Sequence, residues 1–108
     1  MELLLDPQAK KQVVMIFKEA MNNCAKYAAS TQVTFTVRSD GQYATFELRD
    51  NGKGFNVQQK SQGRGLQNMV NRAKKIGGDF SITSSPKGTH IILRRIPHSR
   101  DEFQREAI

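Results

Sequence analysis

The sequence predicts an α/β fold class, a two-layer α/β sandwich in which helices pack on one face of a mixed β-sheet. Two segments place apolar residues along one face at helical spacing. Four further segments alternate apolar and polar residues, as half-buried strands do. The elements follow in the order α-β-β-loop-α-β-β. A chain of 108 residues, 37% of them hydrophobic, is long enough for one domain with a modest core.

The first helix is expected over residues 8–29. Asp6 followed by Pro7 is a start signal, because the carboxylate can cap a free N–H and proline fits the first turn. One face of this helix carries the expected core stripe, which consists of Val13, Phe17, Ala20, Met21, Cys24 and Ala28.

A hairpin and a loop are expected next. Residues 56–63, "NVQQKSQG", are polar and lack periodicity, so they predict a loop. Before them, two alternating runs flank the turn sequence "SDGQ", and their apolar members are Val33, Phe35, Val37, Ala44, Phe46 and Leu48.

A second helix is expected over residues 64–76, ended by Gly77 and Gly78. A strand pair joined by "SSPKG" follows it and ends near Pro97. We therefore assign residues 1–97 to one domain and residues 98–108 to a charged C-terminal tail. The apolar stripe of the second helix consists of Leu66, Met69, Val70, Ala73 and Ile76.

Composition excludes several classes of protein. No apolar run approaches the ~18 residues of a membrane span, and the N-terminus lacks the pattern of a signal peptide. We expect a cytoplasmic domain, on its own or as the cytoplasmic part of a membrane-bound sensor, without membrane contact of its own. The single cysteine, Cys24, excludes an intrachain disulfide and a zinc site built from cysteines.

The positive charge lies mainly in the second half of the chain. Residues 1–54 hold seven basic and six acidic residues, whereas residues 55–108 hold ten and four. A nucleic acid, a phosphorylated ligand or an acidic protein surface would each satisfy this charge, and a solvated basic face would need no partner.

Two polar groups carry candidate chemistry. In "LRDNGKGF", Asp50 stands just before Gly52 and Gly54, and taken alone this run favours a hairpin turn. On the first helix, a carboxylate, two amides and an ammonium group share one surface, which taken alone favours a solvated face. These four residues are Glu19, Asn22, Asn23 and Lys26.

Together the motifs resemble those of the GHKL ATPase and kinase superfamily, over about residues 13–97. The run from Gly63 to Thr89 most closely resembles the catalytic domain of bacterial sensor histidine kinases of the nitrate-sensor type. The motifs, each on the expected element, are Glu19-x-x-x-Asn23 with Lys26, Asp50-x-Gly52-x-Gly54, Gly63-Arg64-Gly65-Leu66 and Gly88-Thr89.

The resemblance implies the Bergerat fold, with ATP between the polar face of the first helix and the loop before the second. Asp50 would accept a hydrogen bond from the adenine amine, and a water shared with Thr89 would satisfy the neighbouring ring nitrogen. Guanine presents a carbonyl oxygen at the same place, so the carboxylate would reject it. Gly52 and Gly54 would let the backbone approach the base.

The resemblance also assigns the phosphate end of the site. Asn23 would place its side-chain oxygen on Mg²⁺. Glu19 would polarise the incoming nucleophile, and Lys26 would meet phosphate oxygens. The run Gly63-Arg64-Gly65-Leu66 would bring backbone N–H groups and the start of the second helix to the phosphates.

The sequence departs from the family pattern in a few places. Tyr27 stands where histidine is common, Lys87 lies in a turn often richer in glycine, and the phenylalanine-containing box of many histidine kinases is not evident. The few residues given before the first helix are not expected to form a helical dimerisation domain with a phosphoacceptor histidine. His90 and His98 are expected to be surface residues.

The expected function is that of an enzyme, the catalytic domain of a two-component sensor histidine kinase. With ATP and Mg²⁺ it would phosphorylate a histidine outside this chain, on the dimerisation domain of the same native kinase, and a response regulator would be an indirect partner. No nucleic-acid partner is expected. An anti-sigma-type serine kinase and a non-catalytic, ATP-gated interaction module remain open.

Overall fold

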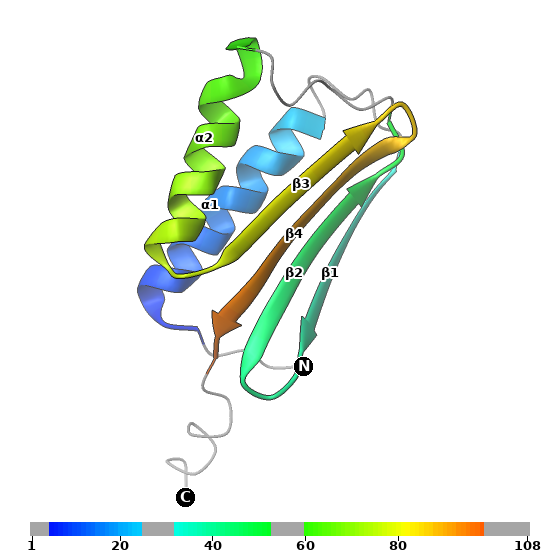
Figure 1. Ribbon diagram of the computed structural model, residues 1–108. Coiled ribbons are helices and arrows are strands. Elements are labelled where there is room, and N and C mark those ends of the chain that lie inside the picture. Colours follow the sequence, from blue (N-terminus) through cyan, green and yellow to red (C-terminus); the bar gives the residue numbers. More distant parts are fainter. Residues whose placement is uncertain (1–4, 25–31, 53–59, 99–108) are drawn as a thin grey trace, which may run out of the picture.

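The computed structural model describes residues 5–24, 32–52 and 60–98, apart from the side chains of residues 60–64. Figure 1 shows two helices side by side on one face of a four-stranded sheet, which confirms the predicted two-layer sandwich. The elements are α1 (Pro7–Asn23), β1 (Val33–Ser39), β2 (Tyr43–Asp50), α2 (Lys60–Lys75), β3 (Asp79–Ser85) and β4 (Gly88–Pro97).

The described strands form an antiparallel sheet in the order β1-β2-β4-β3. We expected a mixed sheet, and a crossover through a helix does usually join parallel strands. The crossover from β2 through α2 to β3 does join two strands of the same direction. However, β4 lies between them and pairs antiparallel with both, so the described part of the sheet contains no parallel pair.

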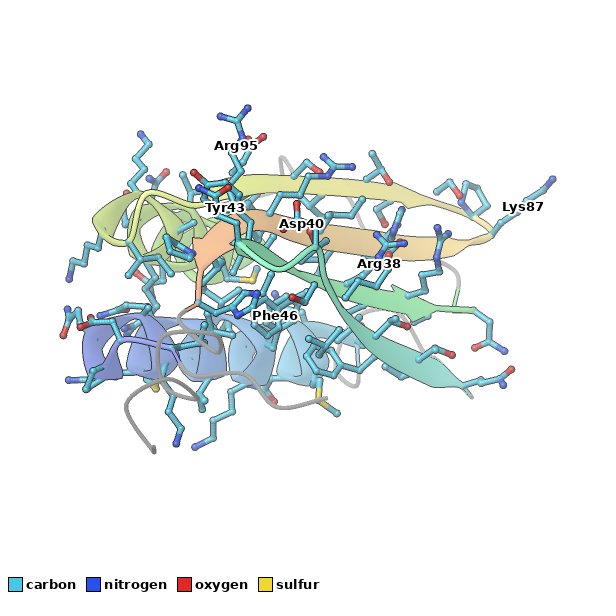
Figure 2. The ribbon with its side chains drawn as sticks, turned by 90° about the horizontal axis from the view of Figure 1, so that it is seen from below. Arg38, Asp40, Tyr43, Phe46, Lys87 and Arg95 are labelled. Atoms are coloured by element: carbon cyan, nitrogen blue, oxygen red, sulfur yellow. The ribbon has the colours of Figure 1, made fainter. Side chains whose placement is uncertain are left out.

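A β-bulge on β4 keeps the core side of that strand apolar. One residue of β2, Thr45, faces two residues of β4, Arg94 and Arg95, and Arg95 has a positive φ of 66°. The extra residue reverses the alternation of β4, so that Ile96 is buried while both arginines are exposed. Figure 2 shows Arg95 projecting away from the body of the molecule.

The start of α1 is the predicted one. Asp6 is the N-cap, and its side chain accepts a hydrogen bond of 3.1 Å from the backbone N–H of Gln8. Pro7 occupies the first turn. The helix extends to Asn23 and Cys24 is its C-cap, while the expected continuation through residues 25–29 lies outside the described residues.

The predicted core stripe of α1 is confirmed for Val13, Phe17, Ala20 and Cys24, which are all buried. Met21 was predicted wrongly, since it is 53% exposed. It lies one turn beyond Phe17 on the side of α1 next to β1, an edge strand that is itself largely exposed. The stripe also includes Ala9 and Ile16, which the prediction missed, and Ala28 lies outside the described residues.

Aromatic rings join α1 to the sheet. The ring of Phe17 lies 5.1 Å from that of Phe35 and 6.1 Å from that of Phe46, measured between centroids. In Figure 2, Phe46 lies between the sheet and α1. The remaining buried core consists mainly of Ala44, Leu48, Met69, Ala73, Ile91, Leu93 and Ile96.

The second helix begins earlier than predicted. α2 starts at Lys60, so the expected loop is wrong over residues 60–63, and residues 53–59 lie outside the description. Its first turn is polar and carries no apolar stripe, which left the sequence pattern without a helix signal there. Its predicted end is confirmed, because Gly78 N–H bonds the Ala73 carbonyl (2.9 Å) and Gly77 N–H bonds the Lys74 carbonyl (3.2 Å).

His98 is buried, although it was predicted as a surface residue of the tail. Its Nε2 lies 2.6 Å from the hydroxyl oxygen of Ser39, and its backbone N–H bonds the Gln42 carbonyl at 3.2 Å. These two bonds attach the residue after β4 to the β1–β2 hairpin. The rest of the predicted tail, residues 99–108, is outside the described part of the chain.

Neither described helix combines the length and the hydropathy required to cross a lipid bilayer.

Candidate nucleotide site

Asp50 ends β2 as a buried carboxylate, only 8% exposed. Its Oδ1 accepts a hydrogen bond of 2.7 Å from the backbone N–H of Gly52, and its Oδ2 accepts one of 3.1 Å from the thiol of Cys24. The inward alternation of β2 through Phe46 and Leu48 places this side chain on the helix side of the sheet. A buried acceptor is therefore held in a defined orientation at the edge of the core.

The thiol of Cys24 remains protonated at neutral pH. Burial raises its pKa to about 12, and the hydrogen bond to Asp50 and the negative charge of that carboxylate act in the same direction. Sequence reasoning placed Cys24 in the core stripe and missed this contact. The only available signal was its position directly after Asn23.

The β3–β4 hairpin closes one side of Asp50. Gly88 has a φ of 139°, and a Cβ at this position would collide with the backbone carbonyl of Asp50. The next residue, Thr89, is buried, and its hydroxyl lies 3.1 Å from that of Ser84. The structure thus brings the Gly88-Thr89 motif to the end of β2, and it shows why glycine is needed there.

The polar face of α1 meets α2 at Gly65. A Cβ on Gly65 would collide with Oε1 of Glu19, so the absence of a side chain makes room for this carboxylate. One turn further along α1, Asn23 is buried at 6% exposed, whereas Asn22 is exposed. The alternative interpretation, a solvent-exposed polar face of the first helix, therefore holds for Asn22 but not for Asn23.

An open cavity of about 590 Å³ follows this face of α1. It offers a carboxylate, an amide and an ammonium group beside two methionines, a mixture that suits a ligand with apolar and charged parts. Its described lining is Met15, Lys18, Glu19, Met21 and Asn22.

For several predicted site residues the structure describes nothing or only the backbone. Lys26 and Gly54 lie outside the described residues. Gly63 and Arg64 belong to the backbone of the first turns of α2. Leu66 packs against the hydrophobic core, so its side chain supports the position of α2.

A second buried carboxylate lies on the outer face of the sheet, and sequence reasoning missed it. Glu47 is 7% exposed and forms ion pairs of 3.1 Å with Arg38 and with Arg49. Its Oε2 also contacts Nε2 of His90. The hydrogen bond to His90, followed by the charge of Arg38, lowers the pKa of Glu47 below its ordinary value of 4.5 against the opposing effect of desolvation.

The chain belongs to a known ATPase family. Residues 8–100 match the family described as histidine kinase-, DNA gyrase B-, and HSP90-like ATPase. Sensor protein VraS of Staphylococcus aureus is 38% identical over 90 residues, which cover 82% of this chain and 26% of that protein. VraS of Staphylococcus haemolyticus is also 38% identical, over 88 residues that cover 81% of this chain and 25% of that protein.

Solved structures show the same fold. The ATP binding domain of PrrB from Mycobacterium tuberculosis superposes with a TM-score of 0.66 at 24% identity, covering 82% of this chain and 68% of that one. The histidine kinase domain of the Erythrobacter litoralis EL346 blue-light activated histidine kinase gives 0.69 at 14% identity, covering 83% and 48%.

These comparisons confirm the predicted superfamily. The chain carries an ATP-binding domain of the kind found in sensor histidine kinases. It spans about a quarter of the length of the curated relatives it matches.

Proposed function

We propose that the chain is the catalytic domain of a two-component sensor histidine kinase of the nitrate-sensor type, which transfers the γ-phosphoryl group of Mg-ATP to a histidine outside this chain. The observation that carries the proposal is the buried carboxylate of Asp50, oriented by two donors at the end of β2. The identity with sensor proteins supports it. The resemblance to nitrate-sensor-type kinases continues without interruption from Gly63 to Thr89 and supports that subfamily.

Asp50 would select adenine. Cys24 and Gly52 both donate to this carboxylate, and an ionised carboxylate only accepts hydrogen bonds. The adenine amine satisfies such an acceptor, whereas the guanine carbonyl leaves it facing another acceptor. The buried hydroxyl of Thr89, on the neighbouring strand, is suited to hold the water that adenine shares. Gly52 and Gly54 would keep this edge open to the base.

The residues of α1 suit a magnesium-bound phosphate chain. Among residues 5–24, 32–52 and 60–98, no three acidic, histidine or cysteine side chains form a metal cluster. Mg²⁺ needs no such cluster, because it commonly takes one or two protein oxygens and completes its shell with phosphates and water. Asn23 would provide the amide oxygen. When bound, the ion neutralises phosphate charge during transfer.

Glu19 and the start of α2 would act on the reacting end. Glu19 would polarise the attacking imidazole, and the absence of a side chain on Gly65 leaves room for its carboxylate beside α2. The N-terminus of α2 would face the phosphates with its free backbone N–H groups and a positive dipole end, and Gly63 and Arg64 would lie beside them in the first turns of the helix. Lys26 would add a cation.

The acceptor histidine would come from another domain. His98 is buried and bonded to Ser39, far along the sheet from Asp50, because Ser39 and Asp50 stand at opposite ends of the β1–β2 register. His90 is held by Glu47 on the outer face. Both contacts support a histidine in trans, on a helical dimerisation domain of the native kinase. A response regulator would then receive the phosphoryl group from that domain.

Labelling with ATP tests the proposal. The chain is incubated with γ-labelled ATP and Mg²⁺, alone and with a histidine-bearing dimerisation domain, and acid-labile, base-stable label is measured. We expect label on the added domain only. The Glu19→Gln variant should still bind ATP but transfer little label, which separates transfer from binding.

Other outcomes support the alternatives. Acid-stable label on the serine of a small protein substrate would indicate an anti-sigma-type serine kinase. ATP binding without transfer to any acceptor would indicate a gated interaction module. Prompt labelling of the chain alone would contradict an acceptor in trans.

A further inference from the structure

Cys24 lies where α1 meets the end of β2. Its side chain is 1% exposed, and its Sγ is 3.1 Å from Oδ2 of Asp50, a residue 26 positions further along the chain. The backbone N–H of Cys24 bonds the carbonyl oxygens of Ala20 and Met21. The last turn of α1 therefore fixes the backbone of Cys24, and burial confines its short side chain beside Asp50.

A core-filling role does not account for this geometry. A free cysteine that only fills space behaves as a small hydrophobic residue. Here the sulfur contacts a carboxylate oxygen, and a thiolate at the same place would repel it. The 3.1 Å separation from Oδ2 of Asp50 identifies the S–H group as a hydrogen-bond donor to that carboxylate.

We propose that Cys24 is a positioning residue that orients the carboxylate of Asp50 for adenine and thereby sets the preference of the site for ATP over GTP. This inference rests on the role proposed above for Asp50. The N–H of Gly52 holds Oδ1 and the thiol of Cys24 holds Oδ2, so donors from two different elements fix the plane of the carboxylate. Without the thiol, the carboxylate loses its donor from α1.

Substitutions that separate volume from hydrogen bonding test the role. Cys24→Val keeps an apolar side chain of similar size without a donor, Cys24→Ala removes donor and volume, and Cys24→Ser keeps a donor. Ile16→Val is the matched control, because it trims a fully buried residue of the same helix away from Asp50. ATP and GTP affinities are measured by calorimetry with Mg²⁺, beside the thermal unfolding midpoint.

We expect Cys24→Val and Cys24→Ala to lower ATP affinity about tenfold with little change for GTP, because a hydrogen bond to a charged group is lost. Cys24→Ser should keep the ATP-to-GTP ratio within about threefold of the wild type. Ile16→Val should lower the unfolding midpoint and keep the ratio. A wild-type ratio in both Cys24→Val and Cys24→Ala would overturn the proposal.

A spectroscopic measurement on the folded chain does not depend on how the Cys24 variants fold. The chain has one cysteine, so its infrared S–H stretching band belongs to Cys24 alone. We expect this band at the low frequency of a strongly hydrogen-bonded thiol, moving to higher frequency in Asp50→Asn because an amide oxygen is a weaker acceptor. A band typical of a free thiol in the wild type would overturn the inference.

The Asp50→Asn variant also separates this inference from the proposed function. Loss of ATP affinity in Asp50→Asn together with unchanged ratios in the Cys24 variants would overturn the role of Cys24 and leave the adenine site intact. Unchanged ATP affinity in Asp50→Asn would overturn both.

Discussion

Two buried carboxylates of the same strand face opposite layers of the molecule. Asp50 points to the helix side, where Cys24 and Gly52 donate to it. Glu47, three residues earlier, points to the outer face, where Arg38 and His90 contact it. The odd spacing along a strand of period two puts them on different faces, so one is available for ligand selection while the other stabilises the sheet.

At the residue scale, Asp50→Asn should lower ATP affinity by about 10–100-fold and leave the fold intact, because it would remove the proposed charge-assisted hydrogen bond to the adenine amine. Calorimetric titration measures the change. Glu47→Gln is the matched control, since it makes the same acid-to-amide change on the other face of β2 and should keep ATP affinity. Equal affinities of the Asp50 variant and the wild type would exclude Asp50 as the adenine reader.

The pH dependence of stability should report on Glu47. Its pKa is lower in the folded chain than its ordinary value of 4.5, so the stabilisation is complete above that pH and is lost as the pH falls towards the folded pKa. Glu47→Gln should therefore be less stable at pH 7 and depend less on pH below about 4.5. Urea unfolding at several pH values measures this, with Asp79→Asn as an exposed acid-to-amide control. A Glu47→Gln profile parallel to the wild type would contradict the assignment.

At the scale of elements, periodicity predicted what is local. The start of α1 at Asp6-Pro7 and the hairpin register through "SDGQ" follow from capping and alternation. The start of α2 at Lys60 and the exposure of Met21 did not follow, because neither is encoded in a local pattern. The start of α2 depends on a polar first turn. The exposure of Met21 depends on how little of α1 the edge strand β1 covers.

Two turn glycines provide a controlled comparison at this scale. Both have positive φ values, 96° at Gly41 and 139° at Gly88, but a Cβ at Gly41 meets nothing within 4 Å whereas one at Gly88 meets the Asp50 carbonyl. Gly88→Ala should therefore cost more stability than Gly41→Ala and should also weaken ATP binding, because Asp50 must move. Thermal unfolding and nucleotide titration measure both effects. Similar losses in the two variants would mean that backbone strain alone acts at Gly88.

At the scale of the whole molecule, the site consists of contacts between distant segments. Cys24 meets Asp50, and Gly65 meets Glu19, only after both helices have packed on the sheet. Motif order assigned residues to the proposed site, because each motif lies on a recognisable element, and that assignment stays a prediction. It did not predict the thiol donor or the outer-face ion pairs of Glu47, since register and packing create both.

Ligand binding should stabilise the whole fold, in a way that depends on Asn23. At an ATP concentration about 100 times the dissociation constant, binding to the folded chain alone adds about 2.7 kcal/mol and raises the unfolding midpoint by roughly 10–20 °C. For the wild type, the rise should be larger with Mg²⁺ than with a chelator, because the amide oxygen of Asn23 would bind the metal. For Asn23→Ala the two rises should be equal, even if the variant is less stable without nucleotide, because the comparison uses differences within one variant. Scanning calorimetry at fixed ATP, with Mg²⁺ or chelator, makes the measurement. A magnesium-dependent rise that persists unchanged in Asn23→Ala would remove Asn23 from the metal site and leave it as a buried polar residue of α1.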